Sequence, residues 1–147
     1  MSTLRNVVTA RNVLICAGIY YSSGWLTFLF AIGYDKLTQG IIYRGDFAAD
    51  VVLPLVEHFP RALFSAAAGV AVVYFVESNQ EISWALFPAA MYATFGFLGY
   101  HWARPPMVTD RVGQTIGALF PAVTCILGAI LANRRWSKVR PSHEILA

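Results

Sequence analysis

The sequence predicts an all-α protein, a polytopic integral membrane four-helix bundle with an interfacial amphipathic helix in the first loop. Two observations carry this prediction for the single domain 1–147. Hydrophobic residues make up 57% of the chain and charged residues 13%, about half the charged share of soluble domains. The clearest apolar run, 113–133, contains no charge, and about 20 such residues cross the hydrocarbon core as a helix.

The first predicted span covers residues 12–34, which carry no charge. Hydroxyl groups interrupt its apolar surface at Tyr20, Tyr21, Ser22, Ser23 and Thr27. In lipid such hydroxyls bond to carbonyls of their own helix or to a neighbouring helix. Cys16 in this span and Cys125 in the last lie in apolar runs and outside any CxxC pair, so we expect two small buried side chains.

The segment 35–61 separates the first two spans. Within it, residues 46–59 have an amphipathic pattern, because the three acidic residues of this stretch fall on one helical face and apolar residues fall on another. A helix with this pattern lies in the membrane interface and does not cross the bilayer. Pro54 is expected to bend or split it.

The second span, residues 60–77, has a charge-free stretch of 15 residues between Arg61 and Glu77. This is short for a crossing, and we expect Arg61 to snorkel toward the interface. Small residues permit close helix contact, so we place this span in the interior of the bundle. The predicted packing residues of the second and fourth spans are Ala62, Ala66, Gly69, Gly113, Gly117, Gly128 and Ala132.

The third span, residues 82–103, follows a short acidic turn, which makes it the antiparallel neighbour of the second. Trp84 and Trp102 stand at its two ends, where interfacial aromatic residues belong. The fourth span, residues 112–133, is followed by the basic tail 134–147. Cations immediately after a span favour the cytoplasmic side, so we expect both termini in the cytoplasm.

This topology brings polar residues from all four spans to the outer side. The candidate ligand-binding residues are Tyr34, Asp35, Lys36, His58, Arg61, His101 and Arg104. Such groups could hold the head of a quinone, a lipid or a small anion, with an apolar tail between helices. His58 and His101 could instead ligate one metal or a haem. The alternative is that each histidine is an ordinary interfacial residue.

The sequence contains none of the HExxH, P-loop or GxSxG motifs, so no catalytic residue is predicted. No acidic residue lies in the middle of a span, which argues against an ion-coupled pump. The cations sit at helix ends and form no arginine-rich run among aromatic residues, so nucleic acid is not expected as a partner. The expected partners are the lipid bilayer and other membrane subunits, or further copies of this chain.

The first span ends in Phe-Ala-Ile-Gly-Tyr-Asp-Lys-Leu, residues 30–37. This stretch resembles the aromatic-Gly-x-x-Lys-Leu ending of the first helix in DoxX-like membrane proteins, and the order of elements is similar. The resemblance implies a bacterial inner-membrane protein associated with quinone or sulfur redox systems, and it carries over Lys36 by motif. The buried acid of that family's second helix is not reproduced, because Glu77 lies at the helix end.

These observations together predict a non-catalytic inner-membrane protein. It would be an accessory or assembly subunit of a membrane complex, or a homo-oligomer, with small-residue helix faces making the contacts. Two alternatives stay open. One is a redox subunit that binds quinone or haem, and the other is a small-solute transporter.

Overall fold

The computed structural model describes residues 2–38, 53–76, 81–103 and 111–136. These residues form four α-helices: α1 (Ser2–Thr38), α2 (Leu53–Phe75), α3 (Glu81–Ala103) and α4 (Arg111–Trp136). The predicted all-α class is confirmed, and each predicted span corresponds to one helix. The shortest helices have 23 residues and a length of about 35 Å at 1.5 Å per residue, which exceeds the roughly 30 Å of hydrocarbon.

Three of the described helices are long and apolar enough to cross a membrane. Their apolar stretches are Val8–Tyr34 in α1, His58–Phe75 in α2 and Thr115–Arg135 in α4. The apolar part of α3, Ile82–Leu98, is shorter. The structure therefore supports the first, second and fourth predicted spans by length and composition, and it gives the third as a helix with a shorter apolar stretch.

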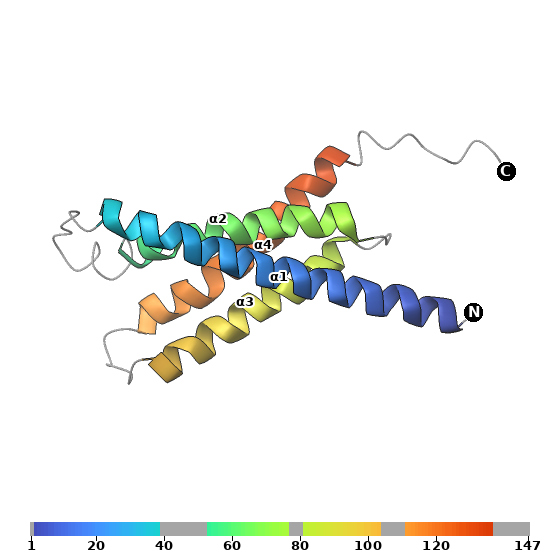
Figure 1. Ribbon diagram of the computed structural model, residues 1–147, viewed down its shortest axis with the longest axis horizontal. Helices are drawn as coiled ribbons and strands as arrows, with labels where there is room; N and C mark the ends of the chain where they lie inside the picture. The colour runs from blue at the N-terminus through green and yellow to red at the C-terminus, as the bar shows by residue number, and fades with distance from the viewer. Residues whose placement is uncertain (1, 39–52, 77–80, 104–110, 137–147) are drawn as a thin grey trace.

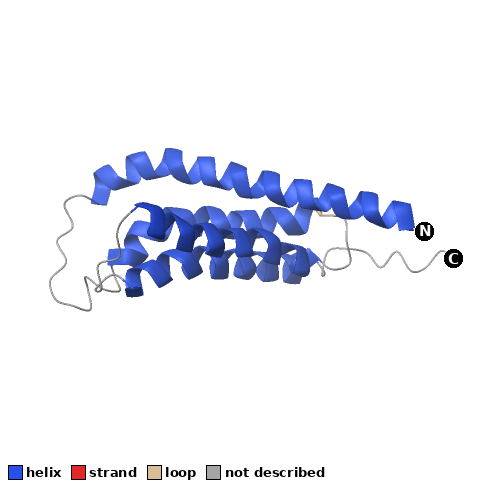
Figure 2. Cartoon of the chain, turned by 90° about the horizontal axis from the view of Figure 1, so that it is seen from below, coloured by secondary structure: helices blue, strands red, loops and turns tan. Residues whose placement is uncertain are grey.

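Helices α2, α3 and α4 pack together, and α1 lies along one side of them (Figure 2). Successive helices run in opposite directions, so the start of α1 and the end of α4 lie at the same end of the molecule (Figure 1). Helix α2 contacts all three other helices, and its contact with α4 is the most extensive of all. Helix α3 also contacts all three other helices, and α4 is buried to a similar extent, so the interior position of the second span stays a prediction.

Glycines allow the close approach of α2 to α4. Gly69 of α2 lies against the backbone of Cys125, and Gly128 of α4 lies against the backbone of Ala66. A Cβ atom added at either glycine would fall within 3 Å of the facing main chain. Small residues in lipid-embedded helices serve this purpose, since they let two backbones approach closely.

A buried hydroxyl pair joins the same two helices. The hydroxyl of Ser65, which is fully buried, lies 2.7 Å from the hydroxyl of Thr124 and 2.8 Å from the carbonyl oxygen of Ala62. The Thr124 hydroxyl also lies 3.0 Å from the carbonyl oxygen of Phe120 in its own helix. Both hydroxyls are thereby satisfied at the interface, as burial requires.

Two thiol groups face carbonyl oxygens of α3 in the turn before Pro88. Because proline has no N–H group, the carbonyl of Trp84, four residues earlier, has no helical donor. The Cys16 thiol of α1 lies 3.8 Å from this carbonyl oxygen, and the Cys125 thiol of α4 lies 3.9 Å from the carbonyl oxygen of Ala85. Both cysteines are buried and free, so the predicted burial of these two side chains is confirmed.

The structure differs from the prediction of a separate interfacial helix over residues 46–59. Residues 53–59 form the first turns of α2, which continues without a break to Phe75, while residues 46–52 lie outside the described residues. Pro54 does not split the helix, because it is the second helical residue, where no backbone donor is needed. The amphipathic pattern in residues 53–59 therefore belongs to the start of the second span.

Helix α1 has an inverted distribution of polar and apolar side chains. Its buried face includes Asn12, which is 1% exposed, and Ser23, which is 5% exposed. Its outer face includes Leu14, which is 73% exposed, and Leu29, which is 62% exposed. A helix on the surface of a water-soluble protein shows the opposite pattern, and this difference bears on the environment of the protein.

Candidate ligand-binding groove

Of the residues predicted as a ligand site, Tyr34 and His58 have described side chains at the end of the molecule where α1 ends and α2 begins. There Tyr34 of α1 stacks on Phe59 of α2, with ring centroids 6.2 Å apart and an interplanar angle of 28°. One turn earlier in α1, Phe30 meets Phe64 edge to face at 5.7 Å. The structure therefore places the end of α1 against the first turns of α2, which hold His58.

His58 packs between α2 and α4. Its ring rests on Gly117, where an added Cβ atom would lie 2.5 Å from Nε2 and 2.9 Å from Cε1 of the histidine. The other predicted ligand-binding residues have side chains outside the described part of the structure: Asp35, Lys36, His101 and Arg104. Among the described residues, no group of three histidine, cysteine or acidic side chains could hold a metal ion.

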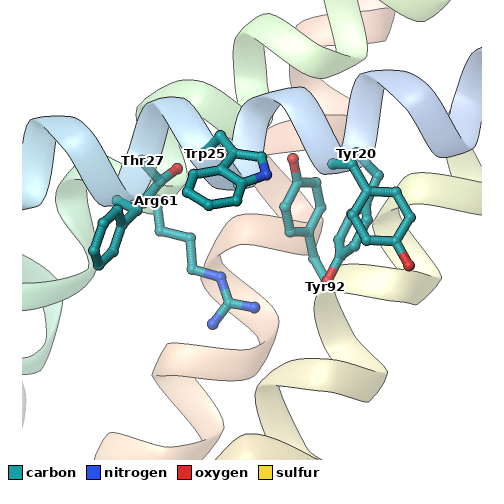
Figure 3. Close-up of a pocket in the computed structure, with 8 residues that line it drawn as sticks. Tyr20, Trp25, Thr27, Arg61 and Tyr92 are labelled. Atoms are coloured by element: carbon teal, nitrogen blue, oxygen red, sulfur yellow. The ribbon is translucent and has the colours of Figure 1, made fainter.

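Arg61, about one turn further along α2 than His58, lines a groove between α1 and α3. The groove has a volume of about 530 Å³, within the range of ordinary ligand sites. We name it the aromatic groove after its lining, which is Tyr20, Tyr21, Gly24, Trp25, Thr27 and Phe28 of α1, Arg61 of α2, and Tyr92 of α3. Figure 3 shows these side chains around a common space.

Aromatic contacts fix the inner part of the aromatic groove. The ring of Tyr20 lies 5.0 Å from that of Tyr92 and stacks on Phe95 at 5.9 Å. The hydroxyl of Tyr92 and the hydroxyl of Ser23 form a hydrogen bond, which ties α1 to α3. Aromatic pairs at these separations add about 0.5–1.5 kcal/mol beyond area burial, so this wall is a stable part of the fold.

The guanidinium group of Arg61 extends into the aromatic groove below Trp25 and toward Tyr92 (Figure 3). It lies near enough to Tyr20 and Tyr92 to act electrostatically on both. Among the described residues it has no hydrogen-bond or ion-pair partner. The predicted snorkelling of Arg61 toward the membrane interface stays a prediction, and the structure adds that this half-buried side chain lines a groove beside α1 and α3.

A second groove of about 500 Å³ lies on the opposite flank of α1. It is bounded by Gly18 and Leu26 of α1 and by Phe64, Ala67 and Phe75 of α2, among others. No charged side chain lines it in the described part of the chain. The two grooves therefore differ in chemistry, because only the aromatic groove presents a cation.

The small residues that we expected to contact partner proteins are used within the chain. Each one whose surroundings the structure describes is buried or faces another helix of the same chain. These residues are Ala62, Ala66, Gly69, Gly117, Gly128 and Ala132, while Gly113 lies outside the described side chains. A contact with another protein would have to use a different surface.

Sequence reasoning identified Arg61 but missed the rest of the aromatic groove. The available signal was a run of aromatic residues on one side of the first span, at Tyr21, Trp25 and Phe28, which recur at helical spacing. The contribution of Tyr92 from α3 could not be found in this way, because it depends on how α1 crosses α3.

The fold and the groove define a class of protein. It is all-helical, with three helices long and apolar enough to cross a membrane, and its lateral groove is lined by one cationic side chain, that of Arg61. Comparison with known protein families, with curated proteins and with solved structures finds no match to this chain. The resemblance to DoxX-like proteins therefore stays a prediction.

Proposed function

We propose that this protein is an integral membrane protein whose four helices all cross the bilayer. The supporting observation is the inverted pattern of α1, which buries Asn12 and Ser23 and exposes Leu14 and Leu29. In lipid the hydrocarbon covers apolar side chains, and polar groups find their place between helices. Helix α3 fits the same environment, since about 17 apolar residues are the lower limit for a crossing.

The proposed orientation places both termini in the cytoplasm of a bacterium, with the protein in the inner membrane. The last turn of α4 carries Arg134 and Arg135, and the start of α1 lies at the same end of the molecule (Figure 1). Cations that follow a span favour the cytoplasmic side. The bacterial inner membrane is the location that the DoxX-like resemblance implies.

Within the membrane, the proposed function is the binding of a lipid-soluble amphiphile in the aromatic groove. The single observation that carries this proposal is Arg61, a cation directed into an aromatic space that reaches the lipid-facing surface at Tyr21 and Trp25. Rings of this kind hold apolar or planar groups, and the guanidinium group holds a polar head. Quinone and haem, the cofactors considered from the sequence, are members of this wider ligand class.

Two leucine substitutions test the proposed groove. Gly24 lines the aromatic groove and Gly18 lines the second groove, and neither has an atom within 4 Å of an added Cβ. Gly24→Leu should therefore fill the aromatic groove without disturbing the helices, and Gly18→Leu is the matched control. Native mass spectrometry of gently extracted protein should show a small bound mass in the wild type and in Gly18→Leu, and no bound mass in Gly24→Leu.

The result also separates this proposal from the alternatives. A bound mass that persists in Gly24→Leu would remove the aromatic groove as the binding site. Other protein chains in the same extract would support an accessory subunit, although its contacts would have to avoid the small residues already used between α2 and α4. A quinone or haem mass would assign the protein to redox chemistry.

A further inference from the structure

The aromatic groove contains a single charged group within its described lining. The apolar stretch of α2 begins at His58, so Arg61 lies about one turn inside the proposed span. The other lining residues are aromatic, glycine or threonine, with no acid among them. The guanidinium group therefore faces a medium of low polarity without a carboxylate from the described lining.

Arg61 is a half-buried cation near the start of the apolar stretch of α2. A buried charge is costly unless it is paired and hydrogen-bonded, and arginine side chains within membrane spans pair with other groups or face water-filled cavities. Arg61 has no hydrogen-bond or ion-pair partner among the described residues, which include the side chain of none of the eight acidic residues. An anionic ligand is a counter-charge that the shape of the aromatic groove allows.

We infer that the aromatic groove selects an amphiphile with an oxyanion head, a carboxylate or a phosphate. This inference rests on the proposed function, because it specifies the head group of the ligand that the groove binds. The planar guanidinium group presents paired donors that match both oxyanions in a bidentate contact. A neutral head, such as a quinone ring, would leave the charge of Arg61 uncompensated.

The aromatic groove also offers two hydroxyl donors for the head of such an amphiphile and an open side for its apolar tail. The hydroxyl groups of Tyr20 and Tyr21 line the groove and make no hydrogen bond within the described structure, so both can donate to an oxyanion. Trp25 and Phe28 are exposed on the outer surface of α1. An acyl or isoprenoid tail can therefore leave the groove past these rings and enter the lipid.

Trp25 provides the measurement, because brominated acyl chains quench the fluorescence of a nearby indole ring. The purified protein is kept in micelles of an alkyl maltoside, whose head carries no oxyanion, and titrated with a fatty acid, a phosphatidic acid and a fatty alcohol that carry the same brominated chain. The specific signal is the saturable quenching found in the wild type and absent from Trp25→Phe. Titration at a pH where the fatty acid is ionised gives an apparent affinity for each head group.

We expect the anionic heads to bind about ten to one hundred times more tightly than the alcohol, the range for a hydrogen bond to a charged group. Arg61→Gln should remove this preference. Arg135→Gln, which removes a charge at the far end of α4, should leave it unchanged. Tight binding by the fatty acid alone or by the phosphatidic acid alone would support the inference and identify the source of the oxyanion.

Two negative results have different meanings. Equal affinities for all three heads in the wild type would overturn the oxyanion inference while leaving amphiphile binding in place. Absence of any quenching that depends on Trp25 would instead remove the proposed function. If Arg61→Gln loses its helical circular dichroism, the comparison of the three heads on the wild type decides the question by itself.

Discussion

Replacement of Gly128 by alanine tests the closest helix contact in the protein. An added Cβ atom would lie 2.9 Å from the carbonyl carbon of Ala66 and 3.1 Å from its Cα, and nearer still to its carbonyl oxygen. Carbon atoms in contact are separated by about 3.5–4.0 Å. Helices α2 and α4 would therefore have to move apart by about 1 Å, because the obstacle is main chain and cannot rotate away.

The expected cost follows from this geometry. Overpacking of a well-filled interior costs about 1–3 kcal/mol, and the separation of α2 from α4 also weakens the hydrogen bond between Ser65 and Thr124. Gly33→Ala is the matched control, because nothing lies within 4 Å of a Cβ atom added at this helical, exposed position. That change should stabilise the helix by up to about 1 kcal/mol. The two substitutions should therefore change the free energy of unfolding in opposite directions.

The assay is reversible unfolding in mixed detergent micelles, followed by helical circular dichroism. Labelling of the buried thiols of Cys16 and Cys125 provides a second signal, since a maleimide dye reaches them only after the helices separate. We expect the free energies of unfolding of Gly128→Ala and Gly33→Ala to differ by about 2–4 kcal/mol. If both variants shift stability in the same direction and by similar amounts, the close approach of α2 to α4 is wrong.

Three further substitutions can be measured in the same unfolding assay. Ser65→Ala removes a fully buried hydroxyl group and should destabilise the protein by about 0.6–1.5 kcal/mol; no loss would mean that this interface carries no useful hydrogen bond. Asn12→Leu should raise stability by about 1 kcal/mol or more, because both polar side-chain atoms of Asn12 are buried without a partner in the described structure; a clear loss would indicate a missing partner. Pro88→Ala restores a helical donor to the carbonyl that the Cys16 thiol faces, so Cys16→Ala should cost less in the Pro88→Ala background than in the wild type, and equal costs would refute the role of the thiol.

The sequence was sufficient to predict the helices, because composition and uncharged length are local properties. It also identified the residues of closest packing, since glycine and alanine at Gly69, Gly128 and Ala66 have little purpose in lipid except helix contact. It could not tell which helix each one faces. That assignment depends on the crossing of α2 and α4, and it changes the meaning of these residues from contacts between proteins to contacts within one chain.

The start of the second span was predicted wrongly for a physical reason. Residues 46–59 have three acidic residues on one helical face and Pro54 among them, and this pattern suits a short interfacial helix. In the structure α2 runs through Pro60, which is fully buried. Tertiary packing outweighs the local cost of the missing backbone donor, and no local pattern reveals how much packing is available.

The aromatic groove was the part of the site least accessible to sequence reasoning, because it exists only where two helices fail to pack closely. Helix α1 meets the other helices through Ser23, Cys16 and Asn12, and glycine makes none of its close contacts, since Gly18 and Gly24 have nothing within 4 Å of an added Cβ. The glycines between α2 and α4 have the opposite effect and close that interface. Small residues therefore have two roles in this chain. They join helices where they face a backbone, and they leave open space along α1 beside the side chain of Arg61.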